Sequence, residues 1–238
     1  MKRVIVYSGI AACTVFAFAS CDNELENWNS ATYDYDGRYV VAAVCREKPS
    51  KNAIIEKGNE IYLYNTAANV ANEIWLDDVS GKFPLKSRFQ LNGNAAAFSG
   101  TATAENTRSK YSIYSAEADA YVEFVAANAG DFPVAAAAGQ SCDGIQEYIR
   151  ITLEEGKIQP ASATTVGGNI SDGIYLKFTL HTDNVKFVSY ALPAEEWSNP
   201  DEPEYGWQLV PNSNAADPGK DEHWTLTGYR YTGYPEDR

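Results

Sequence analysis

Apolar and polar side chains alternate with a two-residue period along most of this chain. In the clearest stretch, 174–181, every second side chain is Ile, Leu or Phe, and the residues between them are Tyr, Lys, Thr and His. Because successive side chains of a β-strand point to opposite faces, this alternation predicts a strand with one buried and one wetter face. The stretches 85–92 and 148–153 repeat the pattern.

Turn residues separate the strand-like stretches. Asn92-Gly93, for example, is a pair typical of a β-hairpin. The long helical patterns that an α/β sheet requires are missing, so we predict an all-β chain whose strands form a meander closed as a barrel or a sandwich. The predicted strands are 38–46, 60–65, 73–77, 85–92, 95–103, 148–153, 174–181, 186–192 and 224–231.

Two regions lack this regularity. Residues 105–144 contain a run of small side chains, and residues 195–220 are rich in Pro, Asp, Glu, Asn and Gly. Such compositions are typical of connections rather than of sheet interiors. We therefore predict both regions to be insertions or long loops within one β domain, residues 34–238. In the first of them, 111–114 and 121–125 are candidate strands of a hairpin.

The first 20 residues follow a different pattern. Lys2 and Arg3 precede a mostly apolar run from Val4 to Ala19, and the small Ser20 follows. A charged start, a short apolar core and small residues at the end are typical of a secretory signal. The run is shorter than the roughly 20 apolar residues that a membrane-spanning helix needs. We predict that residues 1–20 are a signal peptide.

Cys21 follows Phe18-Ala19-Ser20, which resembles the lipobox of bacterial lipoproteins, where the cysteine is lipidated and begins the mature protein. Phe18 departs from that pattern, which prefers Leu. Ile10-Ala11-Ala12-Cys13 also matches but would leave too short an apolar core. An ordinary signal peptide is the alternative. Acyl chains on Cys21 would anchor the protein in a membrane without a spanning helix.

Residues 21–33 are polar and acidic and predict a flexible tether. The acidic start Asp22–Glu26 resembles the surface-export signal of some Gram-negative lipoproteins. In other bacteria, Asp in this place signals retention in the inner membrane. We expect an exported, lipid-anchored protein of the outer membrane, exposed at the cell surface, with the periplasmic face as the alternative.

The charge balance excludes one class of partner. The chain has 19 basic and 32 acidic side chains, and loss of Lys2 and Arg3 with the signal leaves 17 basic ones and a net charge of −15. Such a surface repels phosphate backbones, so we expect no nucleic-acid binding.

Two cysteines remain in the β domain. Outside the cytoplasm Cys45 and Cys142 could form a disulfide, and two buried free thiols are the alternative. Neither cysteine lies in a metal-ligand spacing, so the sequence predicts no metal site and no cofactor.

Several segments resemble a family of bacterial lipoproteins named lipid-binding putative hydrolases. They are YNTAAN (64–69), IWLDD (74–78), SDGIYL (171–176) and GYRYTGYPED (228–237). The likeness covers most of the chain from about residue 35 and is poor in the two predicted insertions. It implies a calycin-type, lipocalin-like antiparallel β-barrel and a small apolar ligand.

An eight-stranded barrel either fills its interior or holds one small ligand there. The side chains expected to point inward form the candidate binding site, and a dry core is the alternative. They are Tyr39, Trp75, Phe89, Leu91, Ile149, Ile151, Leu176 and Phe178. Arg230, which lies among Tyr229, Tyr231 and Tyr234, is expected to form a structural cation–π contact with them.

No catalytic motif can be assigned. The G-x-S-x-G elbow and the zinc motif H-E-x-x-H are both missing. His181 has Asp183 two residues on, and His223 lies beside an acidic loop, but both patterns are typical of a surface. We therefore expect no catalysis, and a hydrolase remains a lesser alternative.

The expected function is the binding of a small hydrophobic or amphipathic ligand. The high Trp and Tyr content and the expected surface export also suggest a glycan-binding accessory protein. In that alternative, Trp197 and Trp207 in the long exposed region would carry the binding.

Overall fold

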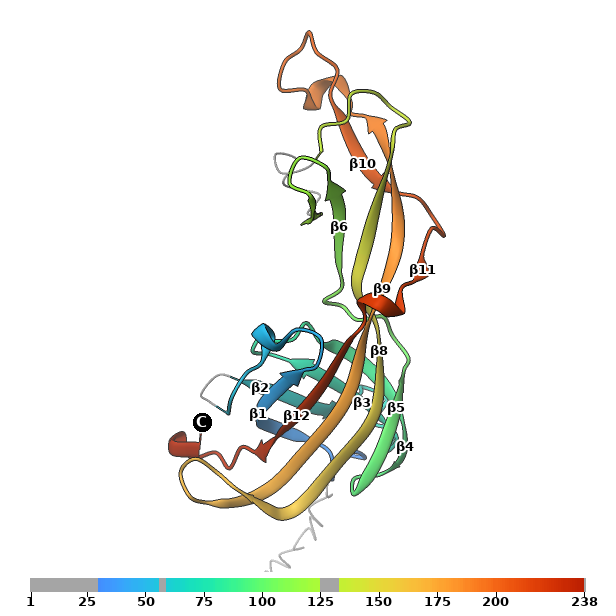
Figure 1. The fold of residues 1–238 in the computed structure, drawn as a ribbon. Coiled ribbons are helices and arrows are strands. Elements are labelled where there is room, and N and C mark those ends of the chain that lie inside the picture. The colour runs from blue at the N-terminus through green and yellow to red at the C-terminus, as the bar shows by residue number, and fades with distance from the viewer. Residues whose placement is uncertain (1–29, 56–58, 125–132, 238) are drawn as a thin grey trace, which may run out of the picture.

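The computed structural model describes residues 30–55, 59–124 and 133–237, and its strands pair antiparallel throughout (Figure 1). The predicted signal peptide, Cys21 and most of the predicted tether lie outside the described residues. The strands are β1 (Gly37–Cys45), β2 (Glu60–Asn65), β3 (Glu73–Asp78), β4 (Lys86–Asn94), β5 (Ala97–Ala102), β6 (Lys110–Ser115), β7 (Ala120–Glu123), β8 (Ser141–Thr164), β9 (Ile170–Ala191), β10 (Tyr205–Leu209), β11 (Ala215–Ala216) and β12 (Glu222–Arg230). Short 3-10 turns are η1 (Pro49–Lys51), η3 (Ala194–Glu196), η4 (Pro218–Lys220) and η5 (Pro235–Asp237).

Eight of these strands close into a ring. The order of pairing is β9, β12, β1, β2, β3, β4, β5 and β8, and β8 then pairs with β9. Closure of the ring leaves no free sheet edge in this part of the molecule, which is how antiparallel barrels avoid exposed edges. The expectation of an all-β, barrel-like fold is confirmed.

The strands β8 and β9 are far longer than the rest, with 24 and 22 residues. One part of each belongs to the barrel, and the other part projects from it as an arm (Figure 1). The pairing shifts register between Gln146 and Arg150, and Tyr148 between them has a φ of 62°. A β-bulge of this kind bends a strand, and here it lies where the barrel passes into the arm.

The arm continues the same sheet, with its strands in the order β7, β6, β8, β9 and β10 and with β11 also paired to β9. Its hydrophobic cluster consists of Ile113, Val185 and Phe187, with partly buried side chains such as Trp207 and Leu209 packed against it. The two segments predicted as insertions or loops, 105–144 and 195–220, contribute β6, β7, β10 and β11 to this arm.

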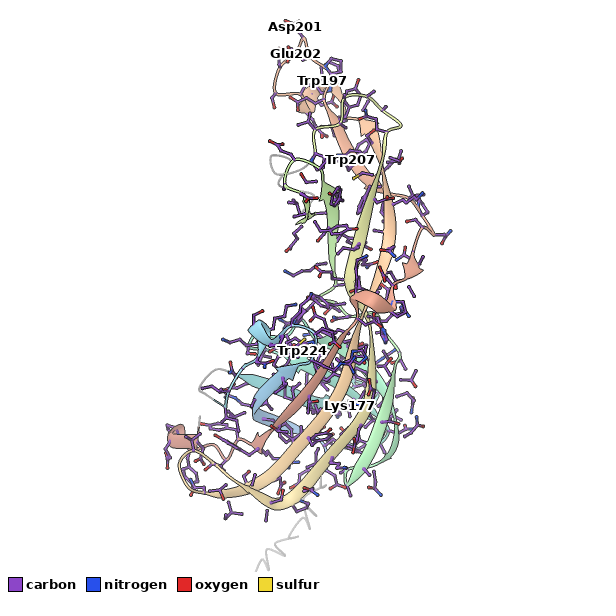
Figure 2. The ribbon with its side chains drawn as sticks, in the orientation of Figure 1. Lys177, Trp197, Asp201, Glu202, Trp207 and Trp224 are labelled. Atoms are coloured by element: carbon purple, nitrogen blue, oxygen red, sulfur yellow. The ribbon has the colours of Figure 1, made fainter. Side chains whose placement is uncertain are left out.

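The barrel interior is one cluster of buried side chains from all eight strands. Trp224 is 0% exposed, and its ring stacks on that of Phe178 with centroids 6.5 Å apart. Figure 2 shows Trp224 near the arm end of the barrel. Burial of this much apolar area is the main favourable contribution to folding.

A buried ionic network lies at this end of the barrel. Glu222 is 1% exposed, and its Oε1 accepts hydrogen bonds from Lys48 Nζ at 2.5 Å, Lys51 Nζ at 2.7 Å and the Tyr148 hydroxyl at 3.1 Å. Trp224 Nε1 donates to Oε2 at 3.2 Å. Burial would raise the pKa of Glu222, but the hydrogen bonds from Lys48 and Lys51 outweigh it and hold the pKa below its usual value of 4.5.

The replacement Trp224→Ala should destabilise the barrel by about 3–5 kcal/mol, because it leaves a large cavity in a closed core. Trp75→Ala is the matched control, since Trp75 lies half-buried on the outer wall and should cost less than about 2 kcal/mol. Urea unfolding of both variants measures the difference. Equal losses of free energy would contradict the assignment of Trp224 to the core.

Glu222→Gln should lower the free energy of unfolding at pH 7, because it leaves Lys48 and Lys51 without their buried counter-charge. A carboxylate with a lowered folded-state pKa stabilises the fold above its unfolded pKa and loses that contribution as the pH falls through the folded value. The gap between wild type and Glu222→Gln should therefore shrink below about pH 4.5. Urea unfolding at several pH values measures it, with the exposed Glu117→Gln as control. A gap that stays constant down to pH 3 would contradict this account.

Candidate functional site

Six of the eight predicted ligand-binding residues lie in the barrel interior. Their exposed fractions run from 0 to 3%. They belong to the single buried cluster: Tyr39, Phe89, Leu91, Ile151, Leu176 and Phe178. A cavity that could hold even one water molecule would leave accessible surface on its lining side chains. Because Tyr39, Phe89 and Leu176 have none, the interior around them is packed with side chains.

The other two predicted residues lie elsewhere. Trp75 is half-buried on the outer wall, where its ring stacks on Tyr64 with centroids 6.5 Å apart. Ile149 is 5% exposed but is not part of the interior cluster, since it lies at the bulge between barrel and arm. The structure therefore does not bring all eight side chains together.

An open cleft of about 440 Å³ is formed by segments that lie at the end of the barrel opposite the arm (Figure 1). The β4–β5 turn, the ends of β8 and β9, the last residue of β12 and the chain before β1 form it. We name it the mouth cleft. Its apolar lining includes Ala95, Ala96 and Ile158, and its charged side chains are Asp34, Asp172 and Arg230. Ile158 is 4% exposed and also belongs to the interior cluster, so the mouth cleft borders the apolar core.

Arg230 lies on the polar side of the mouth cleft and contacts several of its neighbours there. Its Nη2 donates to the Asp34 carbonyl and to the Tyr39 hydroxyl, both at 3.0 Å, and Nη1 lies 3.5 Å from Asp172 Oδ2. The buried Nε has no hydrogen-bond partner among the described residues. Burial raises the pKa of Tyr39 to about 12, so this hydroxyl stays protonated at neutral pH.

The expected cation–π contact of Arg230 is made with a different ring. The guanidinium lies 5.5 Å from the Tyr39 centroid, and Arg38 rather than Arg230 lies over Tyr231, at 4.8 Å. Neighbours along a strand point to opposite faces, so Arg230 cannot easily cover Tyr229 or Tyr231.

His181 belongs to a hydrogen-bonded chain on the outer wall. Its Nδ1 is 2.8 Å from Asp221 Oδ2, and its Nε2 is 2.8 Å from Thr152 Oγ1. The carboxylate is that of Asp221 and not of Asp183, which pairs with Arg150. The order hydroxyl, imidazole, carboxylate is that of a nucleophile, a base and an orienting acid. None of these three residues lines the mouth cleft, so this group of hydrogen-bonded side chains is not part of that site.

The remaining sequence predictions concern cysteines, metals and tryptophans. Cys45 lies in the barrel cluster, Cys142 packs on the arm cluster, and both are free thiols, so the suggested disulfide is not formed. Among the described residues no three His, Cys, Asp or Glu side chains gather closely enough to hold a metal ion. No helix in these ranges has the length and apolar character that a membrane crossing needs.

Trp197 and Trp207, the candidates for glycan binding, are used within the arm. Trp197 lies towards the tip and donates from Nε1 to the Leu192 carbonyl at 2.9 Å (Figure 2). Trp207 packs on the arm cluster and donates to the Pro133 carbonyl at 2.9 Å. Both rings are partly buried.

A comparison with family models matches residues 24–235 to the family described as lipid-binding putative hydrolase. The match spans the barrel and the arm, including both segments that the sequence resemblance covered poorly. A comparison with curated proteins found no match. Membership supports lipid binding in this chain. The protein belongs to the lipid-binding putative hydrolase family.

Proposed function

We propose that this protein is an exported, lipid-anchored protein that binds a small hydrophobic or amphipathic ligand at the mouth cleft of its barrel. The observation that carries the proposal is the cleft itself, which borders the apolar core and has charged side chains in its lining. Binding sites for small molecules combine an apolar lining with a few placed polar groups. The family match supports a lipid as the ligand class.

Because the interior is packed, we place the ligand at the mouth cleft rather than inside the barrel. A lipocalin-like ligand enclosed in the barrel would have to displace side chains such as Phe89 and Leu176, which have no accessible surface. Displacement of packed core side chains is costly. The mouth cleft needs no such change, because it is already open to solvent.

The charges of the mouth cleft favour a polar head without net negative charge. The lining has two carboxylates, Asp34 and Asp172, and one guanidinium, Arg230. Arg230 lies near the Asp172 carboxylate and donates to the backbone carbonyl of Asp34. An anionic head would meet a net negative lining, while a zwitterionic or neutral head could use both signs. We therefore propose an amphiphile with a neutral or zwitterionic head.

The proposed anchor suits this placement. Ser30, where the described chain begins, is close in sequence to Tyr33 and Asp34 of the mouth cleft. An extended chain from Cys21 to Ser30 spans at most about 30 Å. Lipidation of Cys21 would therefore hold the mouth cleft close to the membrane that supplies amphiphiles. Binding at the mouth without catalysis is the activity that we propose.

Ala96→Trp should weaken the binding of a fluorescent lipid, such as a dansyl-labelled fatty alcohol, at least about tenfold, because the indole ring fills the cleft. Ala215→Trp is the matched control, since Ala215 is an exposed alanine in a cleft of the arm and its replacement should leave lipid affinity unchanged. Fluorescence titration of the purified protein measures both. Equal affinity of wild type and Ala96→Trp would refute lipid binding at the mouth.

Cys21→Ser should abolish incorporation of labelled palmitate and move the protein from the membrane fraction to the soluble fraction of the host. Cys13→Ser is the control, because Cys13 lies in the rival lipobox match and its replacement should leave labelling intact. Metabolic labelling followed by fractionation tests the anchor. Label that persists in Cys21→Ser would show that the lipidated residue was wrongly assigned.

A further inference from the structure

We propose that the arm carries a second binding site, for a neutral saccharide, in a cleft beside Tyr121. The cleft has a volume of about 320 Å³ and lies against the arm sheet. Its lining includes Tyr121, Asp143, Asn184, Lys186, Ser213 and Ala215, from β7, β8, β9, β11 and the connection into β11. We name it the arm cleft. Its size is at the lower end of the range for small-ligand sites, which suits one or two sugar rings.

The strand register places the arm cleft on the sheet face opposite the arm's hydrophobic cluster. Cys142 and Phe187 are paired and both belong to the cluster face, whereas the next pair, Asp143 and Lys186, points the other way. Trp207 covers the cluster face, so it is separated from the arm cleft by the sheet. The exposed aromatic surface of the arm is therefore made by tyrosines.

Tyr121 is held in place by two ring contacts. It is 41% exposed, and its ring meets Tyr114 edge to face with centroids 5.6 Å apart. Lys220 Nζ lies 5.7 Å from the centroid of the Tyr121 ring. A ring that is fixed yet exposed offers apolar contact area at little cost in conformational entropy. The C–H face of a sugar ring is the kind of surface that packs on such a platform.

The polar groups of the arm cleft suit hydroxyls. The Asp143 carboxylate and the Lys186 ammonium come from directly paired residues, and among the described residues neither side chain has a hydrogen-bond or ion-pair partner. One can accept and the other can donate hydrogen bonds to a ligand. Because the two charges cancel, the lining attracts neither anions nor cations strongly, and a neutral polyhydroxylated ligand fits best.

The other polar side chains of the arm cleft form a fixed frame. The Asn184 amide donates to Asp217 at 3.0 Å and accepts from Lys220 Nζ at 2.9 Å. Ser213 Oγ accepts a hydrogen bond from the Lys186 backbone N–H at 3.0 Å. These bonds fasten the connection around β11 to β9, so the wall of the arm cleft is already formed without a ligand, which lowers the cost of binding.

The test is calorimetric titration of the purified protein with neutral oligosaccharides of glucose, galactose, mannose and N-acetylglucosamine. At least one should bind, and Tyr121→Ala should weaken it about tenfold or more through loss of the stacking ring. Tyr121→Phe should keep most of the affinity, because the ring remains. Tyr190→Ala is the matched control, since Tyr190 is 39% exposed on the arm but does not line the arm cleft.

The variants at the two clefts make the outcome decisive. Ala215→Trp should block the saccharide and Ala96→Trp should not, the reverse of their effects on lipid. Failure of every neutral oligosaccharide to bind, or equal binding by wild type and Tyr121→Ala, would overturn the proposal. Binding that is confined to charged glycans or to peptides would also overturn it.

Discussion

The pairing of β8 with β9 is the interaction on which the whole structure depends. In the barrel it closes the ring, and beyond the bulge at Tyr148 the same two strands form the centre of the arm sheet. Barrel and arm thus share one continuous ladder. The ionic network of Glu222, Lys48, Lys51 and Tyr148 lies where the ladder changes register, and it ties β12 and the η1 turn to the bulge.

A filled barrel changes how ligand binding in this protein should be understood. Lipocalin-like binding, which the resemblance implied, uses a hollow interior, but Trp224, Phe178 and Phe83 occupy the space near the arm end and further core side chains occupy the rest. The barrel then acts as a rigid scaffold whose ends and extensions are free to bind. Function on such a scaffold is concentrated where strands end and loops begin.

The sequence predicted the all-β class and most barrel strands, because the alternation of apolar and polar side chains in segments such as 174–181 shows which face of the strand is buried. It did not predict the continuity of β8 and β9. In β8 the bulge near Tyr148 interrupts the alternation, and in β9 the polar run 182–184 separates two apolar stretches, so that one strand resembles two. Of the arm strands, β10 and β11 were missed. Tyr205, Trp207 and Leu209 alternate with Gly206 and Gln208, but this five-residue pattern is short and stands among Pro, Asp, Glu and Asn residues that are typical of a loop. Packing density is not visible in a pattern of apolar residues, so Phe89 or Leu176 could equally have lined a cavity. The carboxylate partner of His181 could not be predicted either, because Asp221 lies beside His181 only through the pairing of β9 with β12.

The mouth cleft and the arm cleft lie in different parts of the molecule, and their lining side chains differ in chemistry. The mouth cleft borders the apolar core next to the first described residues, and the arm cleft offers a fixed tyrosine and a balanced charge pair beyond the barrel. If Cys21 anchors the chain, the mouth cleft lies near the membrane and the arm extends from the far end of the barrel (Figure 1). An apolar opening is most useful where amphiphiles are concentrated, and a polar aromatic cleft is most useful where water-soluble ligands arrive. In this arrangement the length of β8 and β9 separates the two surfaces, and the hydrogen-bonded pairing of these strands links them.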